Sequence, residues 1–366
     1  MLLKKHLFSA IILLLALNSS AQITISSKID TSKTNNAQLI KFINTYFQKD
    51  SISKTMWHPK YKNKVVWDYS MDWIWGTWSP KKISTKFDLE LVELQKVNDT
   101  LSYFKISAAS KPEIMHEKFT NVYKYYVVNI NGKYYLDNCK PYDQTRFTEY
   151  KTKNINFYSS PFYHIPPAKM KAAAVELEKL NKQLKRPAIT KPIDYFLCAT
   201  EEELNNLSNI VIWNGGLGGY TNIPERFIVA ISDNPDYKHE FVHALLGTGA
   251  NCFFLQEGMA SLYGGMDEGA KTYEQGIKEL KECYNSGDCN FEKLYARNIG
   301  QKYSSSLTYT FAAACCKYLI NNYGLEYFYK LYYNKDITSE NFLEKVSNIT
   351  GKTPKDFRTG MEKLLF

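Results

Sequence analysis

Two histidines one helical turn apart constrain this chain more than any other feature of its sequence. Residues 236–247 run Asp-Tyr-Lys-His-Glu-Phe-Val-His-Ala-Leu-Leu-Gly. Asn234, with a proline after it, suits a helix N-cap, and Gly247 suits a helix end, so a helix is predicted between them. His239 and His243 then lie on the same face. Two neutral imidazoles placed in this way can bind one zinc ion.

A third ligand and a base are also available. Catalytic zinc takes three protein ligands and keeps its fourth position open. Glu257 is the candidate third ligand, because a connector of Thr248–Cys252 would join its helix to the first one in an antiparallel pair. Glu240 lies on the metal-facing side, where a carboxylate can take a proton from a water on the metal. The sequence therefore predicts one Zn²⁺ per chain, held by His239, His243 and Glu257.

The alternative interpretation is that both histidines are ordinary buried residues and that Glu257 is a surface charge. Histidine is scarce, with six in 366 residues, so this spacing is uncommon by chance. The helix-ending signals and the second carboxylate-bearing segment make a coincidence rarer still.

These residues resemble those of a known peptidase group. The pattern combines His239-Glu240-x-x-His243 with Leu255-x-Glu257-Gly258-x-Ala260. It is similar to the gluzincin zinc metallopeptidases of the thermolysin-like superfamily, and most of all to the exported peptidase MA-like bacterial group. The similarity covers residues 151–340. It implies that the chain hydrolyses peptide bonds, with Glu240 as the base.

The resemblance also implies roles for neighbouring segments. A strand aligned antiparallel to the substrate should precede the zinc helix, and Arg226–Ser232 fits that place. Gly215–Gly219 would cover the cleft, or else form a flexible hairpin loop. Tyr309, at the head of a later helix, matches the tyrosine that stabilises the oxyanion in relatives, although a packing role is the alternative in a chain with 28 tyrosines.

Two departures from the thermolysin pattern affect the surroundings of the metal. The interval between His243 and Glu257 is shorter than in thermolysin. Ser261 stands where thermolysin-like enzymes have an aspartate that orients a zinc histidine. We therefore expect weaker support of the ligands, which affects catalytic strength more than metal binding.

The first 21 residues have the three parts of a secretory signal peptide. They begin with Lys4 and Lys5, continue with the apolar run Leu7–Leu17, and end with Ser19-Ser20-Ala21. The apolar run is shorter than the roughly 20 residues of a membrane-spanning helix. The alternative, a retained membrane anchor, has no second feature in its favour. We expect cleavage after residue 21 and a secreted or periplasmic protein with no stable membrane insertion.

The remaining sequence predicts an α+β protein of two domains. Residues 22–35 are polar and predict a linker. Residues 36–150 predict a small helix-plus-antiparallel-sheet domain, which resembles the nuclear-transport-factor-like fold. Residues 151–366 would form the gluzincin-like (zincin) catalytic domain. The expected strands are 87–97, 101–108, a hairpin at 121–137 around Asn131-Gly132, 155–158, 193–198, 210–213 and 226–232, and the expected helices include 167–185 and one capped by Thr200.

The amino-acid composition indicates which kinds of partner the chain can have. Hydrophobic residues make up 44% of the chain and aromatic residues 15%, which is enough for folded cores and excludes a disordered chain. The net charge is +9, but the lysines are scattered, so nucleic acid is not an expected partner. A peptide or protein substrate is expected instead. A tryptophan cluster would line a ligand pocket or, more commonly, a core: Trp67, Trp73, Trp75 and Trp78.

The chain has seven cysteines, and their odd number leaves at least one thiol free. Cys283 and Cys289 flank the turn-rich segment Tyr-Asn-Ser-Gly-Asp, which predicts a local disulfide in an exported protein. A zinc ribbon is excluded because the sequence contains no Cys-x-x-Cys pair.

The sequence thus predicts a secreted zinc peptidase. One alternative is a binding protein with a weak or inactive metallopeptidase fold, in which the tryptophan-rich domain recognises a ligand. The presence of Glu240 argues against it, because an inactive site needs no base. The other alternative is zinc-dependent hydrolysis of a non-peptide amide.

Overall fold

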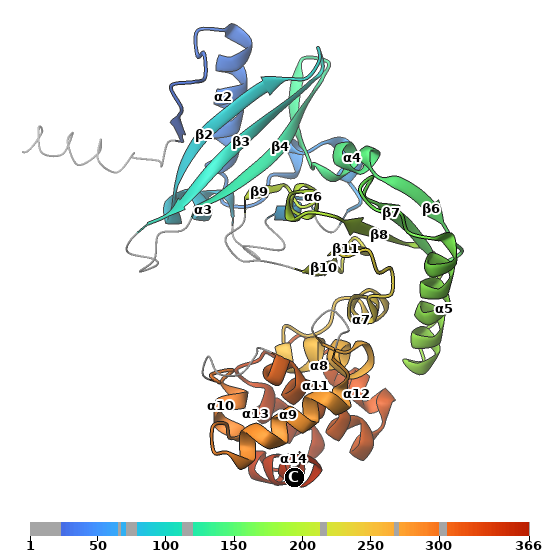
Figure 1. The fold of residues 1–366 in the computed structure, drawn as a ribbon. Coiled ribbons are helices and arrows are strands. Elements are labelled where there is room, and N and C mark those ends of the chain that lie inside the picture. The colour runs from blue at the N-terminus through green and yellow to red at the C-terminus, as the bar shows by residue number, and fades with distance from the viewer. Residues whose placement is uncertain are drawn as a thin grey trace, which may run out of the picture. The chain divides into compact units, whose positions relative to one another are not determined.

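The computed structural model describes residues 23–64, 67–70, 79–111, 120–212, 218–266, 271–299 and 306–365. The chain divides into two compact units. The first comprises Met1–Thr145 with Thr200–Gly216, and the second Arg146–Ala199 with Leu217–Phe366. Each unit contains one mixed sheet, so the fold is mixed α/β (Figure 1). The expected signal peptide at 1–21 lies outside the described residues.

The first unit is built on a six-stranded sheet of order β1-β2-β3-β4-β5, with β9 also paired to β4. Strands β2 to β5 are antiparallel, while β1 runs parallel to β2. Its elements are β1 Thr24–Ile25, α2 Thr34–Phe47, the short 3₁₀ turns Lys54–Met56 and Pro59–Tyr61, α3 Pro80–Lys86, β2 Phe87–Lys96, β3 Leu101–Ser110, β4 Thr120–Ile130, β5 Lys133–Asp137, α4 Lys140–Asp143, α6 Glu201–Asn206 and β9 Ile210–Ile212.

Several sequence predictions for this unit are confirmed. Apolar residues of α2 at helix spacing, such as Leu39 and Ile43, are buried in the first core. Asn131 and Gly132 have φ values of 51° and 81°, as the tight turn between β4 and β5 requires. Thr200 caps α6 by accepting a hydrogen bond from the Glu203 amide.

The domain boundaries differ from those expected. The segment 22–35 is not a plain linker, because β1 pairs with β2 and Ile23 is buried. The first unit ends at Thr145 rather than 150, and it gains Thr200–Gly216 from far along the chain. The buried Asn209 side chain donates to Asn138 at 2.6 Å, a contact between distant residues that no local pattern reveals.

Of the expected tryptophan cluster, only Trp67 is described, and it is buried in the first core. Trp73, Trp75 and Trp78 lie outside the described residues.

The second unit combines a sheet with a large group of helices (green to red in Figure 1). The sheet order is β10-β11-β8-β7-β6. Strands β7, β8 and β11 are parallel, and the outer strands β6 and β10 are antiparallel to their neighbours. The strands are β6 Thr148–Lys151, β7 Ile155–Ser159, β8 Ile193–Cys198, β10 Gly219–Asn222 and β11 Phe227–Ile231. The helices are α5 Pro167–Gln183, α7 Lys238–Leu246, α8 Phe253–Gly264, α9 Tyr273–Asn285, α10 Phe291–Tyr295, α11 Ser306–Tyr323, α12 Leu325–Tyr332, α13 Phe342–Thr350 and α14 Pro354–Leu365.

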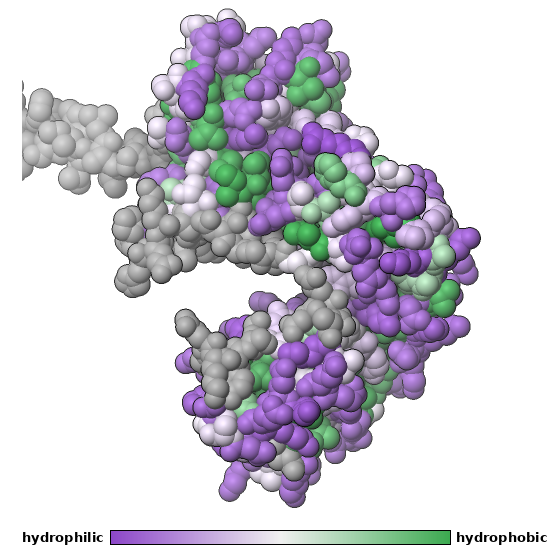
Figure 2. Space-filling model, in the orientation of Figure 1, coloured by the Kyte–Doolittle hydropathy of each residue, from purple (hydrophilic) through white to green (hydrophobic). Residues whose placement is uncertain are grey.

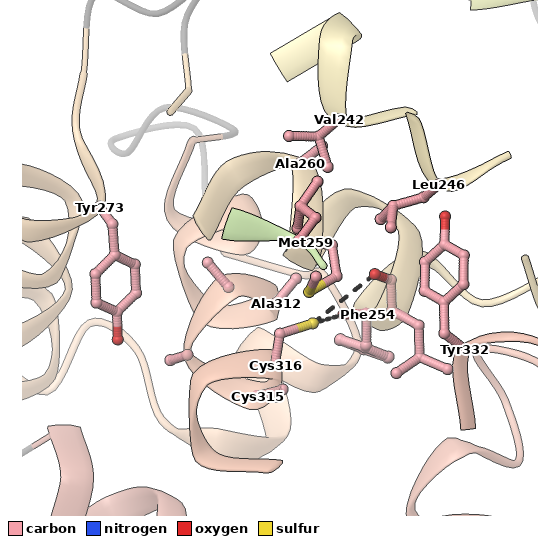
Figure 3. Packing of buried hydrophobic residues seen from close by; sticks show 14 of the residues in the cluster. Val242, Leu246, Phe254, Met259, Ala260, Tyr273, Ala312, Cys315, Cys316 and Tyr332 are labelled. Carbon is pink, nitrogen blue, oxygen red and sulfur yellow. Dashed lines mark hydrogen bonds between the residues drawn. The ribbon is translucent and has the colours of Figure 1, made fainter. Parts of the chain in front are cut away.

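Helices α8 and α11 pack closely at a glycine. A Cβ atom at Gly258 would lie 2.5 Å from the Ala312 carbonyl oxygen and 2.7 Å from the Cys316 sulfur. The Cys316 thiol donates to the Phe254 carbonyl oxygen at 3.1 Å, so it ties the two helices together (Figure 3). Because Gly258 follows Glu257 directly, this contact fixes the backbone of that glutamate.

The helical part of the second unit shows mainly hydrophilic residues on the face seen in Figure 2, in keeping with helices whose apolar sides are turned into the core. No helix in the described parts of the chain is both long and apolar enough to cross a membrane.

The predicted disulfide is present: Cys283, at the end of α9, is bonded to Cys289. The other cysteines are buried thiols: Cys139, Cys198, Cys252, Cys315 and Cys316.

We predict that replacing Cys283 and Cys289 together with serine lowers the free energy of unfolding by about 2 kcal/mol, because the unfolded chain regains the freedom of a short loop. Denaturant unfolding of the double variant and the parent measures this. Non-reducing peptide mapping of exported protein must also recover the two cysteines linked, and recovery of both as free thiols would contradict the assignment.

Candidate metal centre

The helix that carries both histidines begins later than its sequence indicates. Helix α7 starts at Lys238, with Tyr237 in the N-cap position, so Asn234 is not the cap. The Asn234 side chain instead accepts a hydrogen bond from the Asp236 amide at 3.1 Å and closes a turn before the helix. An asparagine side chain can accept a hydrogen bond from a nearby backbone amide either as a helix cap or in a turn, and here tertiary packing selects the turn. Gly247 ends the helix as predicted, with a φ of 70°.

Helices α7 and α8 bring three potential ligand atoms together. The connector between them is Gly247–Cys252, one residue longer than expected. Nε2 of His239 lies 3.1 Å from Oε2 of Glu257 and 3.3 Å from Nε2 of His243. Nε2 of His243 lies 3.4 Å from the same carboxylate oxygen. The three predicted ligands therefore meet at one point of the structure.

The distances between the three potential ligand atoms match those around a small metal ion. A tetrahedral zinc with bonds of 2.0 to 2.2 Å holds neighbouring ligand atoms about 3.4 Å apart. Two neutral nitrogens and one anionic oxygen are a donor set that zinc accepts, and three protein ligands leave one position open. The residues present therefore fit a zinc ion.

The first histidine has a firm orienting partner. Nδ1 of His239 is 2.9 Å from the carbonyl oxygen of Gly265, just after α8. A Cβ atom at Gly264 would lie 2.3 Å from the His239 amide nitrogen, so only glycine allows this approach. The hydrogen bond fixes the ring so that Nε2 faces the cluster. The presence of Ser261 in place of an aspartate predicted weak support of the histidine ligands. For His239 the Gly265 carbonyl provides the orienting hydrogen bond instead.

The second histidine is held differently. Nδ1 of His243 is buried and has no hydrogen-bond partner among the described residues. The buried hydroxyl of Ser261 likewise has no partner within that part of the chain. Packing and the Glu257 carboxylate are what hold the His243 ring, so the expected weakness applies to this ligand.

Glu240 lies beside the cluster without belonging to it. It is 5% exposed, and its Oε2 accepts a hydrogen bond from the Thr221 hydroxyl at 2.6 Å. Thr221 lies on β10, at the edge of the sheet. The carboxylate is therefore held by a neutral donor, and it is not one of the three residues of the cluster.

Tyr309 lies next to the candidate ligands, in the first turn of α11. Its ring is 6.2 Å from the His239 ring and 5.2 Å from the Phe253 ring, centre to centre. Partial burial, followed by the carboxylates of Glu257 and Glu240, raises its pKa to about 12. The phenol thus keeps its proton and remains a hydrogen-bond donor at neutral pH.

The candidate ligand residues influence the pKa values of one another. Burial lowers the pKa of His243, but the Glu257 carboxylate opposes this and raises the pKa to about 9. Burial raises the pKa of Glu257, but both histidines outweigh it and hold the pKa well below its ordinary value. At neutral pH His243 is therefore protonated and paired with Glu257, and a metal bound by this residue would have to displace that proton.

The prediction that Arg226–Ser232 forms the strand along which a substrate aligns is wrong. Arg226–Ser232 contains β11, whose two sides are occupied by β8 and β10. Within the described residues β10 is the edge strand, and it is β10 that contacts Glu240. The expected loop Gly215–Gly219 falls largely outside the described residues, and its last residue begins β10.

Three contributors were not identified from the sequence: Thr221, Gly264 and the Gly265 carbonyl. The Gly264-Gly265 pair at the end of α8 is a sequence signal of close backbone approach. Thr221 carries no such signal, because its role depends on the pairing of β10 with β11.

Comparison of the sequence with protein-family models and with curated proteins gives no significant match.

We predict that the protein, purified without chelators, contains about one zinc per chain, and that His243→Ala loses it because two ligands hold the ion too weakly. Elemental analysis of the purified protein gives the metal content. His164→Ala is the matched control, since His164 is exposed and outside the cluster. Wild-type protein that neither contains nor takes up zinc would refute the assignment.

We also predict that zinc binding to the metal-free protein releases about one proton per ion between pH 7 and 8, because His243, with a pKa of about 9, must give up its proton. Affinity should rise about tenfold per pH unit in this range. Calorimetric titration in buffers of different ionisation enthalpy counts the protons. A pH-independent affinity would contradict the protonation state assigned to His243.

Proposed function

We propose that this protein is a secreted zinc peptidase with a gluzincin-like catalytic domain. The observation that supports this most directly is the convergence of His239, His243 and Glu257 at the spacing that zinc requires. A buried carboxylate, Glu240, stands next to the cluster and outside it. Ligands and base are thus on separate side chains, as hydrolysis requires.

In the proposed reaction, the metal and the side chains of the protein have different roles. A bound zinc ion would supply Lewis acidity, which favours ionisation of a water and polarises a carbonyl group. Glu240 takes the proton from the attacking water and then passes it to the leaving amine. Tyr309 donates a hydrogen bond to the oxyanion that develops on the substrate. Its pKa of about 12 keeps that proton available over the working pH range.

A peptide substrate suits the strand beside the site. Within the described residues no strand pairs with the outer side of β10, and we propose that an extended peptide adds to the sheet there. The Thr221 contact ties β10 to Glu240. A peptide paired along β10 would therefore lie next to the base. This arrangement favours a peptide over a compact non-peptide amide, because only an extended backbone can pair with a strand.

We predict that Glu240→Gln retains zinc but loses hydrolysis by a factor on the order of 10² or more, because the side-chain volume is kept and the basic carboxylate is removed. Glu257→Gln should instead weaken zinc binding, because a neutral oxygen replaces an anionic ligand. Zinc content and cleavage of a mixed peptide library are measured on the same samples.

The two variants control for each other, since each replaces a glutamate near the cluster with its isosteric amide. Equal hydrolysis by wild type and Glu240→Gln would refute the mechanism. Intact zinc in every sample without cleavage by the wild type would favour a binding protein instead of an enzyme.

A further inference from the structure

We infer that Thr221 is the positioning residue that orients the Glu240 carboxylate, and that it couples this orientation to the strand along which a peptide would pair. The inference rests on the proposed function, because only a hydrolase needs Glu240 as a base. Thr221 itself touches neither the candidate ligands nor, in our mechanism, the reacting atoms. It acts through Glu240.

The contact is short and directed. The Thr221 hydroxyl donates to Oε2 of Glu240 at 2.6 Å, and it also lies 3.1 Å from the Glu240 carbonyl oxygen. A hydroxyl has a single proton, and the shorter contact to a charged oxygen is the stronger one. Oε2 is thereby occupied, and Oε1 remains for a water. A glutamate side chain has several rotatable bonds, so this one hydrogen bond removes much of its freedom.

The strand that carries Thr221 is itself fixed. A Cβ atom at Gly219 would lie 2.9 Å from the Tyr237 ring and 2.9 Å from the Val229 carbonyl oxygen, so β10 packs tightly against the start of α7 and against β11. Tyr220 and Asn222 are buried on the other face of β10, while Thr221 points to α7. Threonine is also stiff at χ1 because it is β-branched. The hydroxyl therefore has a defined position.

A purely structural role is the competing interpretation. In that case the bond to the Glu240 carbonyl oxygen matters, and the hydroxyl only fastens β10 to α7. The two interpretations differ in one respect. Removal of the Glu240 carboxylate abolishes the effect of Thr221 if it is a positioning residue, and leaves the effect intact if it is structural, because the carbonyl oxygen is still present.

The test uses Thr221→Val, which keeps the shape but removes the hydroxyl, and Thr221→Ser, which keeps the hydroxyl. Both are made in the wild type and in Glu240→Ala. The full-length mature protein is assayed for zinc content, for kcat and KM on a cleaved peptide, and for affinity to a peptide hydroxamate. A hydroxamic acid binds zinc and gives its proton to a neighbouring carboxylate, so its affinity reports the base without any turnover.

We expect Thr221→Val to retain zinc, to lower kcat about tenfold with little change in KM, and to weaken hydroxamate binding by a similar factor, as loss of a charge-assisted hydrogen bond implies. Thr221→Ser should restore most of each loss. In the Glu240→Ala background, Thr221→Val should change hydroxamate affinity less than twofold.

Each other outcome decides a separate question. Equal kcat and hydroxamate affinity in wild type and Thr221→Val would overturn the positioning role while leaving the peptidase intact. An undiminished effect of Thr221→Val in Glu240→Ala would overturn it in favour of a structural role. If the wild type cleaves no peptide but the hydroxamate measurements show the expected coupling, the proposed function fails and the positioning of Glu240 by Thr221 stands.

Discussion

The candidate metal centre depends on how closely helix α8 approaches its two neighbours. At Gly264 the backbone of α8 comes so near to α7 that any side chain would collide with His239. At Gly258 it comes equally near to α11, against the Ala312 carbonyl. The contact at Gly258 fixes the backbone next to Glu257, and the contact at Gly264 lets the Gly265 carbonyl reach His239.

Close packing of this kind brings charges together, and the chain balances them without a metal. Burial alone would neutralise both Glu257 and His243, since it penalises a charged carboxylate and a charged imidazole alike. Each instead stabilises the charge of the other across 3.4 Å. The pair therefore carries no net charge, although both of its side chains are buried or nearly so.

Much of this could be predicted from sequence because the signals are local. The spacing of His239 and His243 indicates their shared helical face, and Asn131-Gly132 indicates its hairpin. The remaining features depend on contacts between distant residues. Asn234 prefers a cap and a turn equally, and only packing decides between them. A run of apolar residues predicts a strand but not its place in the sheet. The sequence therefore did not show that β10, and not β11, is the edge strand among the described residues. Thr221 could not be identified without that order.

The candidate functional groups lie on several different elements of the second unit. Both histidines and Glu240 lie on α7, Glu257 on α8, Tyr309 on α11 and Thr221 on β10. The helix itself holds the backbone of Glu240 at a constant distance from the backbones of both histidines. Its carboxylate, however, can still rotate, and helix geometry does not limit that rotation. The hydrogen bond from β10 supplies the missing constraint from outside the helix. If a peptide pairs with β10 as proposed, substrate position and the orientation of Glu240 would both depend on this one strand.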